Sequence, residues 1–238
     1  VSLTTVLLPA VSEKFIKREF TSLTESLGQM LKMISFVTLP ITFGTIALNT
    51  EIVSLLFERG QFNSDSVNLV KSALTFHIFG LGFIAFNRIL LAYYQAARTV
   101  RPIFYYGVSI IILNLVLAVI LSEFMGHAGI ALAMTISQMV HFFLLFAGLK
   151  SLEVFVSALS ILKSKSVWLS LQTSFGMFMI LIVVKDITWI EPISVYFKLP
   201  ILVFLGAVFY LGISFLFRNR ELQVLISKSS LTKSSKTG

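Results

Sequence analysis

The chain has 238 residues, of which 56% are hydrophobic and only 13% are charged, and its mean hydropathy is +0.91. Soluble domains carry roughly 25% charged residues, so this composition excludes a soluble globular protein and indicates an integral membrane protein. The absence of cysteine excludes disulfides and thiolate chemistry. The net charge of +8 is explained better by basic loops on the cytoplasmic side of a membrane than by a nucleic-acid partner.

The first apolar stretch, Val1–Val11, is about half as long as a bilayer crossing, which needs about 20 apolar residues. No basic segment precedes it, so it does not have the form of a signal peptide. We expect it to be the truncated end of a helix, and the chain to be the C-terminal part of a longer protein. Ser12–Leu27 mixes apolar and charged residues, and it fits either an amphipathic helix on the cytoplasmic face or a solvated connector.

Six later apolar stretches are long enough to cross a bilayer. They are Met30–Phe57, Val67–Ala97, Pro102–Ser122, Ala128–Leu149, Val167–Val184 and Leu199–Phe217. The connections are short except for Lys150–Ser166 and the basic tail, so no soluble domain fits. The sequence therefore predicts an all-α integral membrane protein, a polytopic helical bundle with a truncated first helix and six transmembrane helices.

The basic residues are distributed unevenly over the two sides of these crossings. Fourteen of the 19 Lys and Arg residues lie on the side that holds the loop after the first helix and the C-terminal tail, and four lie on the other. The positive-inside rule places the richer side, with the C-terminus, in the cytoplasm. Tyr93, Tyr94, Tyr105 and Tyr106 cluster at the cytoplasmic ends of two spans, as an aromatic belt would.

Arg88 lies inside the apolar stretch Val67–Ala97, whose other cation, Lys71, is near the outer end, and it follows Asn87. It lies about nine residues before the inner end, or ~13 Å at ~1.5 Å per residue. An ionisable group at such a depth costs several kcal/mol, so these residues usually face a protein interior or a water-filled cavity. The alternatives are a side chain that extends to the headgroups and an ion pair with another helix.

Four further polar residues lie inside the spans. Asn114 lies in mid-span, where an amide more often joins helices than binds a ligand. Gln138 and His141, three residues apart, share one helix face. His77 precedes Arg88 by close to three turns and lies on the same face, so the two could line a transport path, although a packing histidine is the simpler interpretation.

The candidates for a substrate cavity are therefore Arg88, Asn87, Asn114, His77, Gln138 and His141. The three histidines have no metal-ligand spacing. The spans contain no paired carboxylates and no nucleophile–base arrangement, and no glycine-rich phosphate loop is present. We expect no catalytic residue, no metal and no cofactor, and hence no enzyme.

Several different short patterns occur within the first 150 residues. They read L-L-P-A-V-S at 7–12, L-P at 39–40, L-F-E-R-G-Q-F at 56–62, Y-Y-Q-A-A-R-T-V-R-P at 93–102 and G-H-A-G-I-A-L at 126–132. Taken alone, each has a local explanation: Gly60 can end a helix, and Gly126 and Gly129 allow a tight hairpin. Their order and spacing, however, resemble the C-terminal half of the MurJ (MviN) lipid II flippases, in the multidrug/oligosaccharidyl-lipid/polysaccharide exporter superfamily.

The chain departs from this family's pattern at two places. The loop before Pro102 lacks the usual acidic residue and Thr-Pro pair, and it carries Arg98 and Arg101 instead. His141 occupies a position that is often asparagine in the family. These departures concern loop pairing and polar contacts between helices rather than the fold.

The resemblance implies that residues 1–150 are the remainder of the second transporter lobe, namely the end of helix 8 and helices 9–12. Residues 151–238 would be two additional helices, 13 and 14, with a cytoplasmic basic tail. The resemblance implies that the chain is part of a flippase in the bacterial cytoplasmic (inner) membrane. Such a flippase moves the undecaprenyl-pyrophosphate-linked peptidoglycan precursor, lipid II, from the inner to the outer leaflet by alternating access.

The implied partners are the anionic lipid-linked substrate, the missing N-terminal lobe and membrane lipids. The family's essential cavity arginines lie mainly in the first lobe and early in helix 8, outside this chain, so we expect the fragment alone to be inactive. Two other functions remain open. One is export of another polyprenyl-linked glycan or a drug; the other is a non-transporting scaffold that binds cell-wall synthesis proteins.

Overall fold

The computed structural model describes residues 2–57, 64–154, 161, 163–186 and 194–224. Apart from the single 3₁₀ turn η1, the elements it describes are α-helices. They are α1 (Ser2–Ile16), α2 (Phe20–Ala47), α3 (Asn49–Phe57), α4 (Ser64–Ala96), α5 (Val100–Met125), α6 (His127–Gly148), η1 (Leu149–Leu152), α8 (Lys165–Lys185) and α9 (Val195–Leu216). The turn predicted at Gly60 and the C-terminal tail lie outside the described residues.

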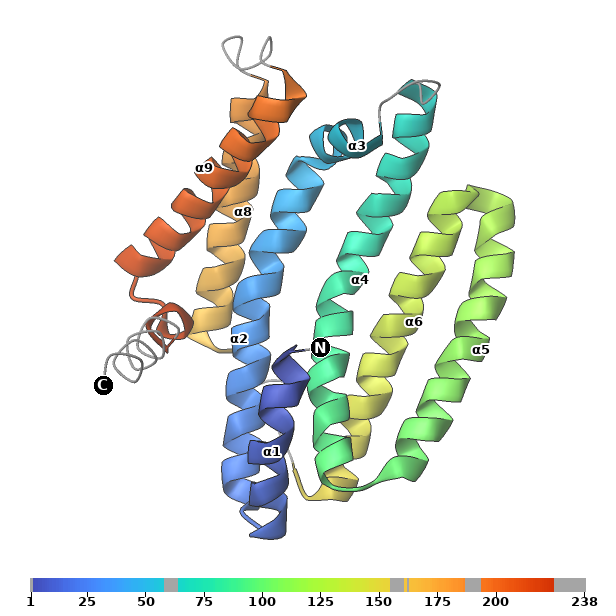
Figure 1. Cartoon of the computed structure of the whole chain (residues 1–238), viewed down its shortest axis with the longest axis vertical. Helices are drawn as coiled ribbons and strands as arrows, with labels where there is room; N and C mark the ends of the chain where they lie inside the picture. Colours follow the sequence, from blue (N-terminus) through green and yellow to red (C-terminus); the bar gives the residue numbers. More distant parts are fainter. Residues whose placement is uncertain (1, 58–63, 155–160, 162, 187–193, 225–238) are drawn as a thin grey trace.

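Six of these helices, α2, α4, α5, α6, α8 and α9, are long and apolar enough to cross a membrane. This confirms the six predicted spans and the all-α class. They stand side by side in the order α5, α6, α4, α2, α8, α9, which differs from the order in the chain (Figure 1). The short helix α1 lies across one face of this row, against α4 and α2. A row leaves two broad faces, and α4 lies near its middle.

Two predicted boundaries were wrong. The stretch Met30–Phe57 is not one helix, because α2 ends at Ala47 and α3 begins at Asn49 after the break at Leu48. Ser12–Leu27 is neither a surface helix nor a connector, since it contains the end of α1, a tight turn and the first two turns of α2. Leu23 and Leu27 are fully buried, so tertiary packing decides the structure of a segment whose composition indicates a surface.

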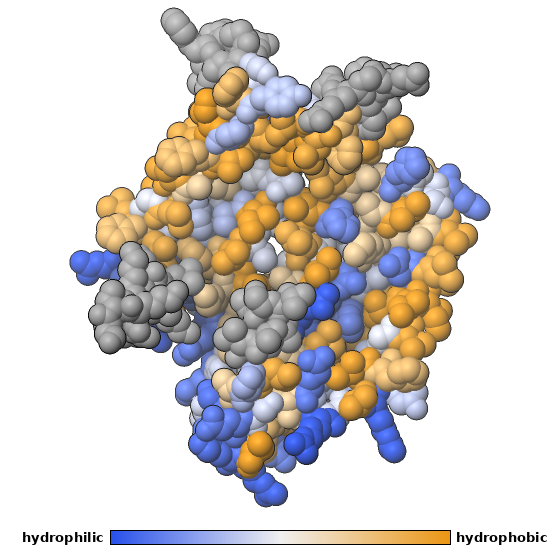
Figure 2. Space-filling view, viewed as in Figure 1, coloured by the Kyte–Doolittle hydropathy of each residue, from blue (hydrophilic) through white to orange (hydrophobic). Residues whose placement is uncertain are grey.

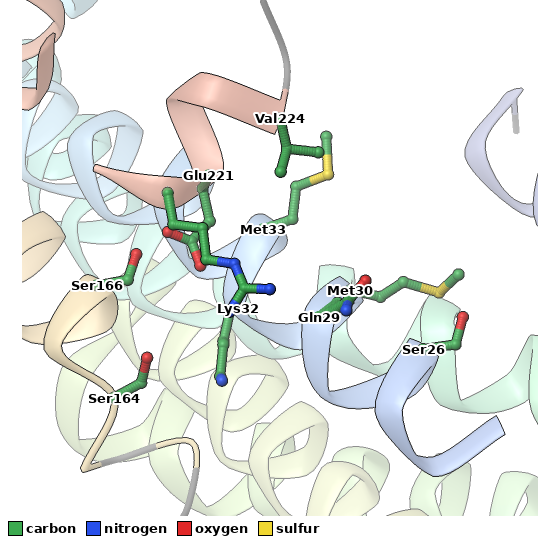
Figure 3. Close-up of a pocket in the computed structure, with 10 residues that line it drawn as sticks. Ser26, Gln29, Met30, Lys32, Met33, Ser164, Ser166, Glu221 and Val224 are labelled. Carbon is green, nitrogen blue, oxygen red and sulfur yellow. The ribbon is translucent and has the colours of Figure 1, made fainter. Parts of the chain in front are cut away.

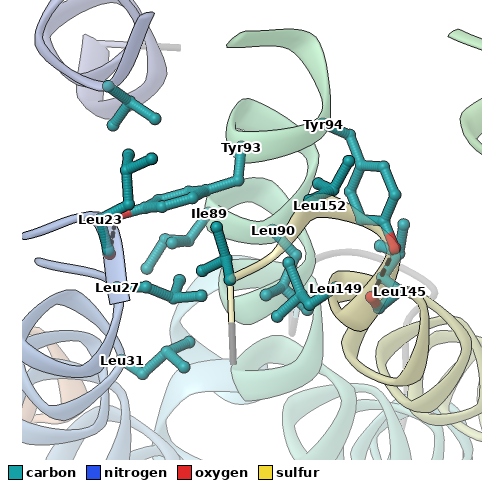
Figure 4. Close-up of a cluster of buried hydrophobic side chains, with 12 residues drawn as sticks. Leu23, Leu27, Leu31, Ile89, Leu90, Tyr93, Tyr94, Leu145, Leu149 and Leu152 are labelled. Carbon is teal, nitrogen blue, oxygen red and sulfur yellow. Dashed lines mark hydrogen bonds between the residues drawn. The ribbon is translucent and has the colours of Figure 1, made fainter. Parts of the chain in front are cut away.

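The larger apolar core joins α1, α2, α4 and α6 at the end of the row where α2 begins. Figure 4 shows its centre, where Tyr93 and Tyr94 extend from α4 in opposite directions. The Tyr93 hydroxyl donates to the Leu23 carbonyl at 3.3 Å, and the Tyr94 hydroxyl donates to the Leu145 carbonyl at 2.8 Å. The aromatic-belt interpretation is therefore wrong for Tyr93 and Tyr94, which are 0% exposed. It agrees with Tyr105, which is exposed near the start of α5.

Three helices, α1, α4 and α9, end in the same kind of turn on this side of the row, although α9 ends nearer to mid-height than α1 and α4 (Figure 1). Arg18, Arg98 and Arg218 have φ values of 55°, 56° and 50°. In each turn the next amide donates to the carbonyl five residues earlier, for example Thr99 to Tyr94 at 3.0 Å. This is the Schellman motif, which usually has glycine at the left-handed position. We call this end of the molecule the basic end.

Figure 2 shows that the polar residues gather mainly at the basic end, whereas apolar residues cover most of the opposite end and the flanks. Helix α5 is the most exposed span, and only 6% of its most apolar window is buried. At the far end, Glu51 of α3 and Lys198 of α9 form an ion pair at 3.9 Å with both side chains mostly buried. This pair links the α8–α9 hairpin to the rest of the row.

The α5–α6 hairpin depends on two glycines. Gly126 has a φ of +56°, a conformation that L side chains rarely adopt, and it connects the helices without a loop. Gly129 lies so close to α5 that a Cβ there would collide with the backbone of Leu121 and Ser122. Small residues allow such close approach between helices in membranes.

We predict that Gly129→Ala destabilises the protein by about 1–3 kcal/mol, as overpacking against a fixed backbone does. The measurement is the thermal unfolding temperature in detergent. Gly107→Ala, also within this hairpin but with no atom within 4 Å of the added Cβ, is the matched control and should leave the temperature unchanged or slightly raised. Equal unfolding temperatures for the two variants would contradict the proposed contact.

Candidate functional site

Asn87 and Gln138 are brought together at the α4–α6 interface. The Asn87 amide donates to both the side-chain Oε1 and the backbone carbonyl of Gln138, each at 3.0 Å. Asn87 is 3% exposed, so this contact is shielded from lipid and solvent. A second hydrogen bond joins the same helices at their other half, where the Thr135 hydroxyl donates to the Phe76 carbonyl at 2.6 Å. Asn87 and Gln138 therefore join the two helices.

Arg88 points away from these contacts, into the exposed face of α4. The structure gives it no hydrogen bond or ion pair to any residue that it describes. Its neighbour Ile89 belongs to the same apolar core as Leu31 of α2. Lys32, which follows Leu31 on α2, lines a cavity together with residues at the start of α8. Arg88 lies roughly two turns before the end of α4 at Ala96.

His77 and Asn114 both line a hollow on the far half of the molecule. The hollow has a volume of about 670 Å³, lies between α3, α4, α5 and α6, and is lined mostly by apolar side chains. His127, at the start of α6, adds a third polar group to its wall. His77 and Arg88 are both exposed on α4, as two residues on one helix face should be. The contribution of His127 was missed, because its motif was interpreted only as a hairpin.

His141 does not join Gln138 in a shared contact. It is half-buried on α6, and its Nε2 is buried without a hydrogen-bond partner among the described residues. The six candidates thus divide into a structural pair, a hollow with His77 and Asn114, an unpaired cation and a partly satisfied histidine. Within the described ranges no group of three potential metal ligands occurs. A cation accompanied by amide and imidazole groups suits the binding of an anion better than nucleophilic chemistry.

Comparison with known proteins identifies relatives of this architecture. The sequence model of the family "Lipid II flippase MurJ" matches residues 1–204. A probable lipid II flippase MurJ of Vibrio cholerae is 28% identical over 169 residues, which are 71% of this chain and 31% of the relative. A probable lipid II flippase MurJ of Thermotoga maritima is 33% identical over 142 residues, 60% of this chain and 29% of the relative.

A solved structure of a lipid II flippase MurJ in an inward closed conformation has a TM-score of 0.72 and 25% sequence identity. The match covers 91% of this chain and 42% of that chain. The chain spans about a third of the length of these curated relatives. Together with the six apolar helices, the relatives indicate a multi-pass protein of the bacterial inner membrane.

The Asn87–Gln138 contact generates a prediction about coupling between α4 and α6. Asn87→Leu and Gln138→Leu should each destabilise the protein, because each leaves a polar group of the partner unsatisfied. A double-mutant cycle, read from unfolding in detergent, should give a coupling energy of about 0.5–1.5 kcal/mol. Pairing either variant with Ser109→Ala, which lies on the exposed side of α5, should give none. Additive effects of the first pair would contradict the structural role.

Proposed function

The chain belongs to the lipid II flippase MurJ family, and from this premise we propose that it forms part of a transporter that moves lipid II between leaflets. Residues 1–150 contribute to the second of two lobes, and residues 151–238 add two helices and a basic tail. The basic end, including the C-terminus, faces the cytoplasm. The observation that carries the proposal is the family match over residues 1–204 in a chain whose helices superpose on a MurJ structure.

The exposed face of α4 supports a path for an anionic lipid along this part of the protein. Arg88 lies there without a partner among the described residues, and the hollow with His77 and Asn114 lies on the same face toward the far end. In a complete transporter the other lobe closes this face and leaves a cavity between the lobes. A pyrophosphate enters the cytoplasmic side, pairs with Arg88 and passes toward the polar hollow as the lobes rock.

The same geometry gives Arg88 an auxiliary part. One guanidinium can form a bidentate pair with a phosphate, but a pyrophosphate carries more charge than one guanidinium compensates. The remaining cations come from the lobe that this chain does not contain. Arg88 therefore captures the headgroup at the cytoplasmic mouth, and its position close to the basic end suits entry from the inner leaflet.

A graft tests the proposed function directly. Residues 1–204 replace the corresponding segment of the Vibrio cholerae relative, and the hybrid is expressed in cells depleted of their own flippase. We expect the hybrid to restore growth, whereas the 238-residue chain alone, at equal abundance in the membrane, should not. A hybrid that is present at the normal level and leaves the cells to lyse would contradict the proposal.

Within that hybrid, Arg88→Gln should lower the rate of lipid II translocation about tenfold, which corresponds to ~1.4 kcal/mol of lost stabilisation. Arg88→Lys should retain most of the rate, because it keeps the charge. Arg101→Gln removes an exposed charge near the start of α5 and is the matched control, with no expected change. A normal rate for Arg88→Gln would show instead that Arg88 only contacts headgroups.

A further inference from the structure

A small cavity, lined by both polar and apolar side chains, lies at the basic end between α2, the start of α8 and the chain that follows α9. Its volume is about 230 Å³. Figure 3 shows side chains from all three segments around this space: Lys32 and Ser26 from α2, Ser164 and Ser166 at the start of α8, and Glu221 after α9. Arg220 also lines it. The family match ends at residue 204, so part of this wall lies outside the region shared with the family.

Asn219 holds the segment after α9 in place. It is 2% exposed, and its Oδ1 accepts hydrogen bonds from the Ser166 hydroxyl at 2.9 Å and from the Glu221 amide at 3.1 Å. Its Nδ2 donates to the Ser170 hydroxyl at 3.1 Å. This network ties the turn to the first part of α8. The cavity wall that carries Glu221 is therefore built by the fold and does not depend on a free tail.

Among the residues that the structure describes, the charged side chains around this cavity form no ion pair with one another. Glu221 is only 8% exposed, and its Oε2 has no hydrogen-bond partner. Lys32 and Arg220 line the same space, yet neither forms an ion pair with Glu221 in the part of the chain that the structure describes. A buried carboxylate without a partner costs several kcal/mol. The cavity thus presents separate sites for an anion and for a cation.

We propose that this cavity binds the headgroup of an amino-phospholipid of the phosphatidylethanolamine type. The phosphate lies between Lys32 and Arg220 and accepts hydrogen bonds from the serine hydroxyls, while the primary ammonium donates to the Glu221 carboxylate. A trimethylammonium group has no N–H donor for that carboxylate. A glycerol headgroup offers only neutral hydroxyls to the carboxylate. The proposal goes beyond lipid II transport, because it assigns a structural lipid to the α8–α9 hairpin.

The position of the cavity favours a lipid over a soluble zwitterion. It lies where α8 begins and shortly after α9 ends, next to the turn with Arg218, which is where membrane helices meet the headgroups. Met30 and Met33 form an apolar part of its wall against which the first carbons of a lipid can lie. Sites for whole drug-sized ligands measure roughly 300–1,000 Å³, so a cavity of this size suits a headgroup.

Lipid titration of the purified, delipidated full-length protein tests the proposal. Phosphatidylethanolamine, phosphatidylcholine and phosphatidylglycerol with identical short acyl chains are added, and binding is measured by native mass spectrometry. We expect the Kd of phosphatidylethanolamine to be at least tenfold below the other two. Glu221→Gln should reduce its advantage over phosphatidylcholine to less than twofold. Lys32→Met should weaken phosphatidylethanolamine and phosphatidylglycerol alike, by fivefold or more.

Two matched controls remove the same charges elsewhere at the basic end. Glu153→Gln and Lys165→Met change exposed side chains that do not line the cavity and should leave all three affinities unchanged. Equal wild-type affinities for phosphatidylethanolamine and phosphatidylcholine would overturn the proposal, as would tighter binding of phosphatidylglycerol or inorganic phosphate, which would indicate an anion site only. Glu221→Gln could lower the unfolding temperature of the lipid-free protein, and its binding data would then not test the site. In that case Lys32→Met is the deciding variant. If it binds phosphatidylethanolamine and phosphatidylglycerol as tightly as the wild type, the assignment is overturned.

Discussion

Polar groups within the apolar layer must find partners inside the protein, and the arrangement of this chain depends on that constraint. Several side-chain hydroxyls satisfy this constraint by donating a hydrogen bond to a backbone carbonyl of a neighbouring helix. Tyr94 and Thr135 do so between α4 and α6, and Tyr93 does so from α4 to α2. Tyr210 of α9 donates to Phe36 of α2 at 2.7 Å. Since hydrocarbon gives little hydrophobic drive between helices, such bonds and close packing hold the row together.

Helix α4 shows how the same constraint separates structure from function. Asn87 and Arg88 are adjacent, and the helical turn of about 100° between them directs one toward α6 and the other to the open face. The Asn87 amide nitrogen donates both of its hydrogen bonds to Gln138 at the helix interface. The guanidinium remains available, on a face that a second lobe would cover. Two neighbouring polar residues that share a span thus have different surroundings.

The α8–α9 hairpin attaches to this row mainly through α2 and at its two ends. At the far end an ion pair links Glu51 to Lys198, and at the basic end Asn219 fixes the chain after α9 to α8. Near this second attachment, charges of both signs surround a cavity and do not pair with each other. A lipid that bridges them would stabilise the hairpin at the level where the chain leaves the membrane.

Hydropathy and length determined the class and the six spans, because each crossing must be apolar over about 20 residues. The positions of Lys and Arg relative to these spans then showed which side carries most of the basic residues. The ordered motifs indicated the family. The sequence could not show the order of helices in the row, the break at Leu48, or the burial of Leu23, Tyr93 and Tyr94. These depend on contacts between distant segments. Periodicity placed His77 and Arg88 on one face, but only tertiary packing decided that Asn87 would be paired, Arg88 exposed and Glu221 buried without a partner.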